Sequence, residues 1–507
     1  MCGWLLPALF VWLAATAWMR PLAQPDEARY VGVALEMLWS GNWLLPTLDT
    51  LPYFHKPPLF YWLTAASLAT FGVNEWAARL PSLLAATGTA LAVYLFVCRW
   101  AGERQARLAL LVLATTPFSF GGAQFANLDM LVAACIAGTI LCAADAVLGA
   151  RGARLRRSTL AGAYAFAALG ILAKGLVGVV IPGLVIGAWL VATGRSAMIL
   201  RLLWLPGLAL VAAIVVPWFA LMEIRHPGFL NYFFVHHHFQ RYTTGDFNGQ
   251  RQLWFYLPVF AGLTVPWFFS LLYAVRRPAA GASGSRDLHA LMWLWLAVTL
   301  IFFSIPISKL VGYVLVAVPP FAVLAADGFT RFVHARGGGE QRWLAGMGAV
   351  AILLCAGGLA AGLVYERNNL QPLAAQVRPL LTSANDEIVV LRTYPFSLAF
   401  YLRHRLPIRV VEDWSEPVLR QKDGWRRELH EAGRFNPQRA QAVLIKPAGL
   451  AHLLECSPRT VWIFALRNEP ERTPDLARLQ LVAAHANHAV WRRPPSSAPE
   501  DRAHCGP

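Results

Sequence analysis

Charged residues are scarce in this chain of 507 residues: only 14% are Asp, Glu, Lys or Arg, whereas 57% are hydrophobic. The mean hydropathy of +0.47 is higher than the core of a soluble protein requires. The composition therefore excludes an ordinary soluble enzyme and indicates a polytopic α-helical membrane protein. No internal repeat with matching broken helices is visible, which disfavours the transporter folds built in that way.

Cysteine is also sparse, with seven residues, no CxxC spacing and no pattern of metal ligands. These cysteines therefore predict neither a disulfide scaffold nor a structural zinc site. Cys456 and Cys505 are the one pair that shares a polar region, where a disulfide would need an oxidising compartment.

Long apolar stretches recur over the first 365 residues, most of them near the ~20 residues that cross a hydrocarbon core. They predict about 11 to 13 transmembrane helices, with Pro57–Gly72 as a shorter re-entrant or interfacial segment. The stretches are 4–19, 78–98, 107–120, 128–148, 159–173, 175–193, 202–222, 253–275, 288–306, 310–327 and 344–364.

Arginines gather in alternate loops between these stretches, as they do in cytoplasmic loops. We therefore expect the other loops, and everything after about Tyr365, on the opposite, outer face. Much of the net charge of +16 lies in the short basic loops, so we predict no nucleic-acid partner.

After Tyr365 the composition becomes more polar, and short β-rich runs alternate with helix-like stretches. This pattern predicts a small α/β domain over 366–492, followed by a disordered, Pro-rich tail over 493–507. The domain carries no Gly-rich phosphate loop, no GxSxG and no metal box, so the sequence assigns it no chemistry. Its β-rich runs are Glu387–Leu391, Ile408–Val411, Ala442–Ile445 and Val461–Leu466.

Two polar clusters stand in the first outer loop, residues 20–77: PDEARY at Pro25–Tyr30 and YFHKPPL at Tyr53–Leu59. Ionisable residues beside a membrane span are costly to desolvate. Carboxylates next to Arg29 and Lys56 therefore suggest a site that handles an anionic group at the bilayer surface. We interpret this loop as a lipid-phosphate site.

In this order, PDEARY, SGNWLLPTL from Ser40 and YFHKPPLFYWL from Tyr53 resemble the bacterial members of the glycosyltransferase 39 superfamily. That superfamily includes protein O-mannosyltransferases and the aminoarabinose transferase that modifies lipid A. The resemblance covers roughly residues 5–330 and continues through ANLDM at Ala126, AKGLVGVVIPG at Ala173, HHHFQRY at His236 and SKLVGYVL at Ser308.

The resemblance implies a membrane-embedded GT-C fold over 1–365, in the bacterial inner membrane, with its active site and C-terminal domain on the periplasmic side. It implies inverting transfer of a sugar from undecaprenyl phosphate, most closely 4-amino-4-deoxy-L-arabinose, to lipid A or a related envelope glycan. The expected partners are that donor, that acceptor and membrane lipids. The alternatives are a protein O-mannosyltransferase-like enzyme and a transporter or flippase of lipid-linked sugars.

Asp26 matches the family's catalytic aspartate. It would act as general base towards a hydroxyl acceptor, whereas with a phosphate acceptor it would orient that group or bind an amino sugar. Glu27 and Asp129 are the other candidate acids. Adjacent side chains of an extended loop point apart, so we expect one of Asp26 and Glu27 to face the site. Asp129 could instead cap the following helix.

Cleavage of the donor leaves negative charge on the lipid phosphate, which fixed cations stabilise. Arg29 and Lys56 are the first candidates, and Tyr313 aligns with a family tyrosine that contacts the carrier phosphate. The other candidates for donor or acceptor binding are Tyr30, Lys174, Arg241 and Lys309, although lysines at span ends also anchor helices by snorkelling.

Histidines form the last candidate site. His55 and His238 would bridge a divalent metal such as zinc if the fold brings their loops together. The aminoarabinose transferases are similar in having a metal-binding acid and histidine at these places, but they typically carry Glu where this chain has His55. We expect catalysis to require no cofactor.

Overall fold

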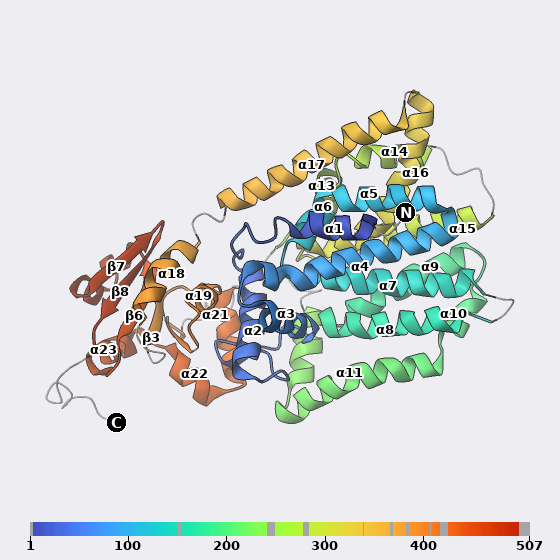
Figure 1. Cartoon of the computed structure of the whole chain (residues 1–507). Helices are drawn as coiled ribbons and strands as arrows, with labels where there is room; N and C mark the ends of the chain where they lie inside the picture. The colour runs from blue at the N-terminus through green and yellow to red at the C-terminus, as the bar shows by residue number, and fades with distance from the viewer. Residues whose placement is uncertain are drawn as a thin grey trace.

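The computed structural model consists of a long helical bundle with a smaller domain built on a β-sheet at one end (Figure 1). It describes residues 4–150, 154–240, 249–276, 283–337, 339–365, 369–381, 386–405, 407–415 and 424–495, without the side chains of 236–240, 276 and 283–285. We call residues 4–365 the helical bundle and 369–495 the sheet domain.

Each of the eleven predicted apolar stretches coincides with a helix or a bent helix pair. Two pairs are bent, by 64° and 111°: α5 (Glu103–Thr115) with α6 (Pro117–Ala123), and α13 (Tyr256–Leu263) with α14 (Phe268–Arg276). The unbent elements are α1 (Leu5–Ala14), α4 (Glu75–Ala101), α7 (Leu128–Leu148), α8 (Arg157–Lys174), α9 (Val177–Ala192), α11 (Leu205–Arg225), α15 (Ser283–Ser304), α16 (Val318–Arg336) after the 3-10 turn η4 (Val311–Ala317), and α17 (Glu340–Tyr365).

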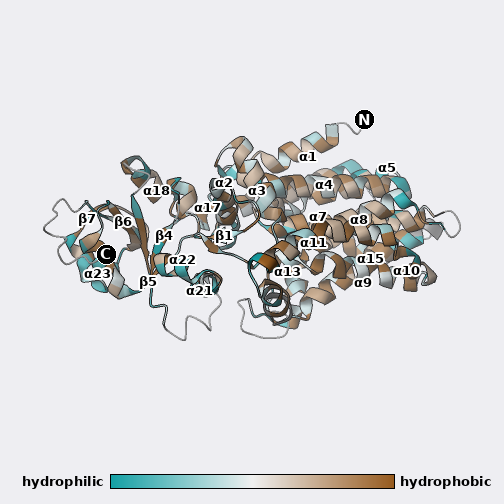
Figure 2. Cartoon of the chain, turned by 90° about the horizontal axis from the view of Figure 1, so that it is seen from below, coloured by the Kyte–Doolittle hydropathy of each residue, from teal (hydrophilic) through white to brown (hydrophobic). Residues whose placement is uncertain are grey.

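Six of the described helices are long and apolar enough to cross a membrane, and the bent pairs bring that number to eight. The prediction of 11 to 13 spans also included stretches that fold as helices too short for this test, such as α1 and α9. The apolar helices make the chain a multi-pass membrane protein. Figure 2 shows the hydrophobic colour along the bundle and the hydrophilic colour on α21 (Trp425–Arg434) and α22 (Pro437–Val443).

The described helix ends beside the arginine-rich loops, such as the end of α4 and the start of α8, lie at the end of the bundle that is remote from the sheet domain (Figure 1). There the arginines pair with acids of neighbouring helices, and these pairs join Arg99 and Arg156 to Asp145, Arg195 to Asp287, and Arg104 to Glu340. The loops that alternate with them, including those of Asp26 and Lys174, lie at the opposite end. The alternation that we found in the sequence therefore corresponds to two distinct ends of the molecule.

The sheet domain contains a six-stranded sheet in the order β5-β4-β3-β6-β8-β7. The first four strands are parallel, and β8 and β7 are antiparallel to their neighbours. This arrangement with its helices confirms the predicted α/β domain. The elements are β3 (Glu387–Leu391), β4 (Ile408–Val411), β5 (Leu444–Ile445), β6 (Val461–Leu466), β7 (Gln480–His485), β8 (His488–Arg493), α18 (Gln371–Val377), α19 (Leu398–Leu402), α21, α22 and α23 (Pro447–Cys456).

The C-terminal boundary differs from the prediction. Arg493, which we assigned to the tail, is the last residue of β8, and its guanidinium donates to the backbone oxygens of Ser457 and Glu455 at 2.6 and 3.0 Å. The hairpin of β7 and β8 was not predicted. Residues 496–507, with Cys505, lie outside the described residues, whereas Cys456 is disulfide-bonded.

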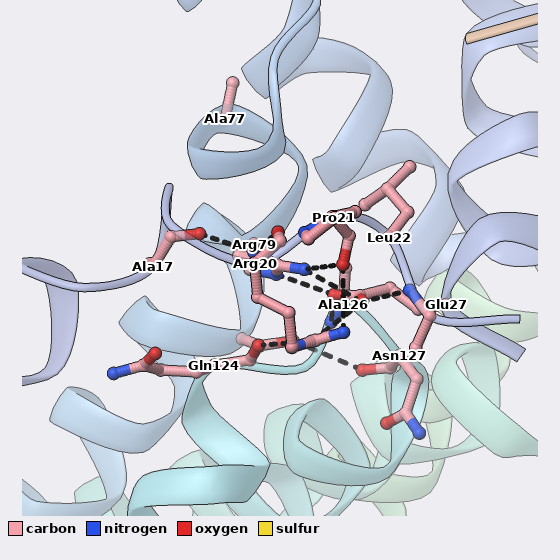
Figure 3. Close-up of polar contacts among 12 residues, drawn as sticks. Ala17, Arg20, Pro21, Leu22, Glu27, Ala77, Arg79, Gln124, Ala126 and Asn127 are labelled. Carbon is pink, nitrogen blue, oxygen red and sulfur yellow. Dashed lines mark hydrogen bonds and ion pairs between the residues drawn. The ribbon is translucent and has the colours of Figure 1, made fainter. Parts of the chain in front are cut away.

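A buried ion cluster fixes the start of α2 (Asp26–Ser40) against the bundle (Figure 3). Glu27 is 0% exposed and accepts hydrogen bonds from Arg79 of α4 at 2.7 and 2.9 Å. It also pairs with Arg20 at 2.8 Å and accepts the backbone N–H of Ala126 at 2.8 Å. Burial alone would raise the pKa of Glu27, but the charges of Arg79 and Arg20 outweigh it and lower that pKa to about 2.

A second buried carboxylate joins α2 to the hairpin of β1 (Thr47–Leu48) and β2 (Leu51–Pro52). Glu36 accepts the Thr47 hydroxyl at 2.8 Å and the backbone N–H groups of Asp49 and Thr50 at 2.6 and 2.9 Å. The side chain of Asp49 then accepts the backbone N–H of Ile408, the first residue of β4, at 2.9 Å. These hydrogen bonds tie the bundle to the sheet domain.

We expect Arg79→Met to lower the free energy of unfolding by about 3–5 kcal/mol, because the Glu27 carboxylate would stay buried without its closest cation. The measurement is the unfolding transition of the detergent-solubilised protein. Arg107→Met is the control: it breaks an exposed pair with Glu103, which is worth at most about 1 kcal/mol. Equal effects of the two substitutions would contradict the role assigned to the cluster.

Stability should also fall as the pH rises, through Glu36 and Asp49. Burial raises the pKa of Glu36 to about 7, and burial followed by the neighbouring Glu36 raises that of Asp49. A pKa that is raised in the folded protein means that the protonated carboxyl group stabilises the folded state. For Glu36 this stabilisation is complete below the pKa of Glu in the unfolded chain, about 4.3, and is lost as the pH rises through 7. The unfolding temperature should therefore decrease between pH 5.5 and 8.5.

Glu36→Gln should flatten this pH dependence, because the amide cannot ionise. Glu103→Gln, which removes an exposed carboxylate at the other end of the bundle, should keep the wild-type slope. The measurement is the unfolding temperature of the three proteins across the same pH series. If the unfolding temperature of Glu36→Gln changed with pH as steeply as that of the wild type, the role of Glu36 would be refuted.

Candidate functional site

A cavity of ≈ 380 Å³ lies where the end of the bundle meets α21 of the sheet domain. Its lining comes from α2, the loop after β2, the starts and ends of the bundle helices, and the sheet domain. Six lining residues are Asp, Glu, Arg or Lys, namely Asp26, Arg29, Lys56, Asp129, Lys174 and Glu428. Five of these six were candidates from the sequence.

Asp26 and Arg29 lie one turn apart on α2, so their side chains share a face of the helix. The Arg29 guanidinium donates to Asp26 and, through its other terminal nitrogen, to Glu428 of α21. It also lies 5.2 Å from the ring centre of Tyr30 and 5.6 Å from that of Phe396. Arg29 is thus held between two carboxylates and two aromatic rings at the wall of the cavity.

Glu27 does not line the cavity, which corrects its prediction as a catalytic acid. We expected one of the two neighbouring carboxylates to face the site, and Asp26 does so. A helix turns about 100° per residue, so the next side chain points towards α4, where Arg79 binds it. The contribution of Glu27 is to hold α2 in place.

Asp129 and Lys174 form an ion pair at the wall formed by the bundle helices. Asp129 lies in the first turn of α7, which Asn127 caps through the backbone N–H of Asp129, and Lys174 is the last residue of α8. The Lys174 amino group also lies 4.1 Å from the ring centre of Tyr313. Gly312 permits this arrangement, because a Cβ there would overlap the Asp129 carboxyl group, with the Cγ atom at 2.9 Å.

His55 lines the cavity and stacks on Tyr53 with 4.5 Å between the ring centres. Its Nε2 atom is 3.7 Å from the carboxylate of Glu431, one turn after Glu428 on α21. Glu431 also accepts hydrogen bonds from Arg427 at 2.8 Å and from the Tyr232 hydroxyl at 2.6 Å. Burial opposes its ionisation, but His55, Arg427 and Tyr232 together hold the pKa of Glu431 below its usual range.

These contacts bear on the predicted metal site. The side chain of His238 lies outside the described residues, so the pair with His55 is not placed. Among the residues whose side chains are described, no group of three His, Cys, Asp or Glu is arranged to hold a metal ion. Glu431, which pairs with His55, is already bound by Arg427, and that cation opposes a second cation there. The described residues thus contain no arranged metal site, and the pair of His55 with His238 stays a prediction.

Of the remaining candidate residues, some line the cavity and others do not or are not described. Lys56 and Tyr30 line the cavity. Lys309 does not line it, because its buried amino group donates to the backbone oxygens of Arg251, at 3.0 Å, and Pro306. Its location therefore supports a structural contact within the loop instead of the predicted ligand binding. Arg241 lies outside the described residues.

Sequence analysis did not identify Glu428, Trp425 or Phe396, which the sheet domain contributes to the cavity lining. Glu428 belongs to the segment WRRELHEAGR, in which acids and arginines alternate as they do on many exposed helices. The one signal was the pair of acids three residues apart, Glu428 and Glu431, which places both on one helix face.

A family model described as dolichyl-phosphate-mannose-protein mannosyltransferase matches residues 55–220. An undecaprenyl phosphate-alpha-4-amino-4-deoxy-L-arabinose arabinosyl transferase from Edwardsiella ictaluri is 30% identical over 387 residues, which are 75% of this chain and 67% of that protein. Its counterpart from Shewanella sediminis is 32% identical over 61% of this chain and 56% of that protein. The chain thus spans little more than half the length of some of the curated relatives that it matches.

Solved structures show the same fold. The crystal structure of ArnT from Cupriavidus metallidurans bound to undecaprenyl phosphate has a TM-score of 0.80 at 24% identity, covering 97% of this chain and 98% of that chain. The apo oligosaccharyltransferase of Archaeoglobus fulgidus has a TM-score of 0.50 at 12% identity, covering 79% and 63%. These likenesses confirm the predicted GT-C architecture.

We expect Gly312→Ala to separate Asp129 from Lys174, because the added methyl group would occupy the position of the carboxylate. Overpacking of this kind costs typically about 1–3 kcal/mol, and the freed Lys174 should react faster with an amine-acylating reagent. Unfolding temperature and mass-spectrometric labelling of Lys174 test this. Gly346→Ala on α17, where an added Cβ meets nothing within 4 Å, should change neither; unchanged labelling in Gly312→Ala would refute the close packing.

Proposed function

The chain belongs to the glycosyltransferase 39 family, and from this premise we propose that it is an inverting, polyprenyl-phosphate-sugar-dependent glycosyltransferase. Its donor would be 4-amino-4-deoxy-L-arabinose on undecaprenyl phosphate, and its acceptor lipid A or a related envelope glycan. The observation that carries this proposal is the cavity in which Asp26 and Arg29 are hydrogen-bonded beside Lys56 and Lys174. The names of the curated relatives, and the ArnT structure with undecaprenyl phosphate, support the choice of donor.

The cations of the cavity would stabilise the leaving group. When the bond between the anomeric carbon and the phosphate oxygen breaks, negative charge grows on the lipid phosphate. Arg29 offers a planar fork of donors, and Lys56 offers a compact charge. Both line the cavity, and a phosphate bound there would compete with Asp26 and Glu428 for the Arg29 guanidinium. These side chains supply the charge stabilisation, and the proposal invokes no cofactor.

Asp26 would act on the acceptor. A hydroxyl acceptor needs a general base, which contributes typically about 10²- to 10⁴-fold to the rate. The carboxylate is held by Arg29 and is partly exposed to the cavity, so a nucleophile can approach it. An acceptor phosphate is already anionic, and Asp26 would then orient it. Attack opposite the phosphate inverts the anomeric carbon.

The proposed orientation places the cavity and the sheet domain on the periplasmic side of the inner membrane. Arginine-rich loops at the other end of the bundle support it, because such loops stay in the cytoplasm. The gathering of the cavity charges at one end suits an enzyme that works at one membrane face and disfavours a flippase. A second candidate is a protein O-mannosyltransferase-like enzyme, which the description of the family model favours.

We expect the Asp26→Asn enzyme to lose transfer while it still binds the donor, because the cations remain. The measurement is mass spectrometry of lipid A from cells that lack the gene, complemented with wild type, with Asp26→Asn or with Asp475→Asn, an exposed acid of the sheet domain. An aminopentose mass should appear with wild type and Asp475→Asn only.

Other outcomes separate the alternatives. Unchanged lipid A in all strains, together with hexose on envelope proteins, would favour the mannosyltransferase-like enzyme. An Asp26→Asn protein that turns over bound donor normally but binds it weakly would contradict the assigned role of Asp26.

A further inference from the structure

Glu428 has one carboxylate oxygen without a partner in the part of the chain that the structure describes. The residue is 4% exposed and lines the cavity. Its Oε1 atom accepts the hydrogen bond from Arg29, whereas its buried Oε2 atom accepts none from the described residues. A buried acceptor that lacks a donor is costly, and more so when it is charged. This oxygen therefore marks a place where a ligand can supply a donor.

The same ion pair also has an unused donor. The buried Nε atom of Arg29 has no acceptor among the described residues, although its two terminal nitrogens bind Glu428 and Asp26. An acceptor and a donor thus lie unfilled on two side chains that touch each other. A ligand that presents both an anionic oxygen and an N–H or O–H group would satisfy both.

The charges of the cavity favour an ammonium as that donor. The lining carries three carboxylates, Asp26, Asp129 and Glu428, and three cations, Arg29, Lys56 and Lys174. A phosphodiester with a neutral sugar would add one negative charge to this balanced set in a partly desolvated site. A phosphodiester whose sugar carries an ammonium group adds no net charge.

We propose that Glu428 determines specificity for the donor sugar by binding its ammonium group. In the free protein Glu428 neutralises Arg29. When the donor binds, its phosphate takes a place on Arg29 and its ammonium group a place on Glu428, so each charge keeps a partner. The inference rests on the proposed function. In it the sheet domain recognises the donor sugar, and α2 binds the donor phosphate.

Glu428→Gln tests this assignment, because the amide keeps the size of the side chain and removes its charge. The probes are undecaprenyl phosphate, the same lipid carrying 4-amino-4-deoxy-L-arabinose, and that donor with its amino group acylated. Wild type should bind the amino donor more tightly than the acylated donor. Glu428→Gln should weaken binding of the amino donor about tenfold or more and remove most of the preference over the acylated donor.

For undecaprenyl phosphate without a sugar, the expected effect of Glu428→Gln on binding is the opposite of that for the amino donor. Undecaprenyl phosphate should bind Glu428→Gln at least as tightly as wild type, because Arg29 has lost a competing anion. A folding defect cannot produce this result. Glu431→Gln removes a carboxylate one turn away that does not touch Arg29, and its effects should not distinguish amino from acylated donor.

Equal weakening of all three ligands in Glu428→Gln would show a structural role and overturn the inference. The inference would also be overturned if Glu428→Gln bound all three ligands with wild-type affinity while the wild-type enzyme uses the amino donor. A wild-type enzyme that ignores the amino donor and transfers a neutral sugar would instead overturn the proposed function, and the inference with it.

Discussion

The burial of Glu27 between Arg79 and Arg20 is the interaction on which the site depends. A carboxylate removed from water needs nearly complete pairing, and Glu27 obtains it from α4, from the segment before α2 and from the backbone of Ala126. The contact with α4 sets the rotation of α2 and thereby turns Asp26 and Arg29 into the cavity. The contact with Ala126 fixes the turn that leads into Asp129. One buried charge thus positions two walls of the site.

The ion pairs at the cavity wall are arranged differently. At the cavity wall Arg29 forms ion pairs with both Asp26 and Glu428, and Lys174 forms one with Asp129. Such pairs hold the cations in fixed places before any ligand arrives, which is the arrangement that electrostatic catalysis requires. They also make the cations less available, because an incoming anion must compete with the resident carboxylate. The site therefore favours a ligand whose anion displaces a carboxylate from its cation and whose own cationic group then pairs with that carboxylate.

The sequence was informative where structure is decided locally. Apolar length predicted the positions of the bundle helices, and β-rich runs predicted β3, β4 and β6 at their observed bounds. The polar motifs, together with the family resemblance, identified Asp26, Arg29, Lys56, Asp129, Lys174 and Tyr313, which all line the cavity. Spacing could not show that Glu27 turns inwards, because that depends on the helical phase set by Arg79. Nor could it show that the Lys309 amino group is taken by neighbouring backbone oxygens. The contact of Glu428 with Arg29 joins residues 399 positions apart, and only packing of the sheet domain on the bundle creates it.

That separation has a consequence for the making of the protein. Asp26 and Arg29 leave the ribosome early, whereas α21 is among the last elements to emerge. For most of its synthesis the chain holds the cations of the cavity without the acid that neutralises Arg29. Assembly of the site is therefore a late event of biogenesis that waits for the sheet domain to fold and dock, and a chain that ends before α21 would retain its membrane helices but an unfinished centre.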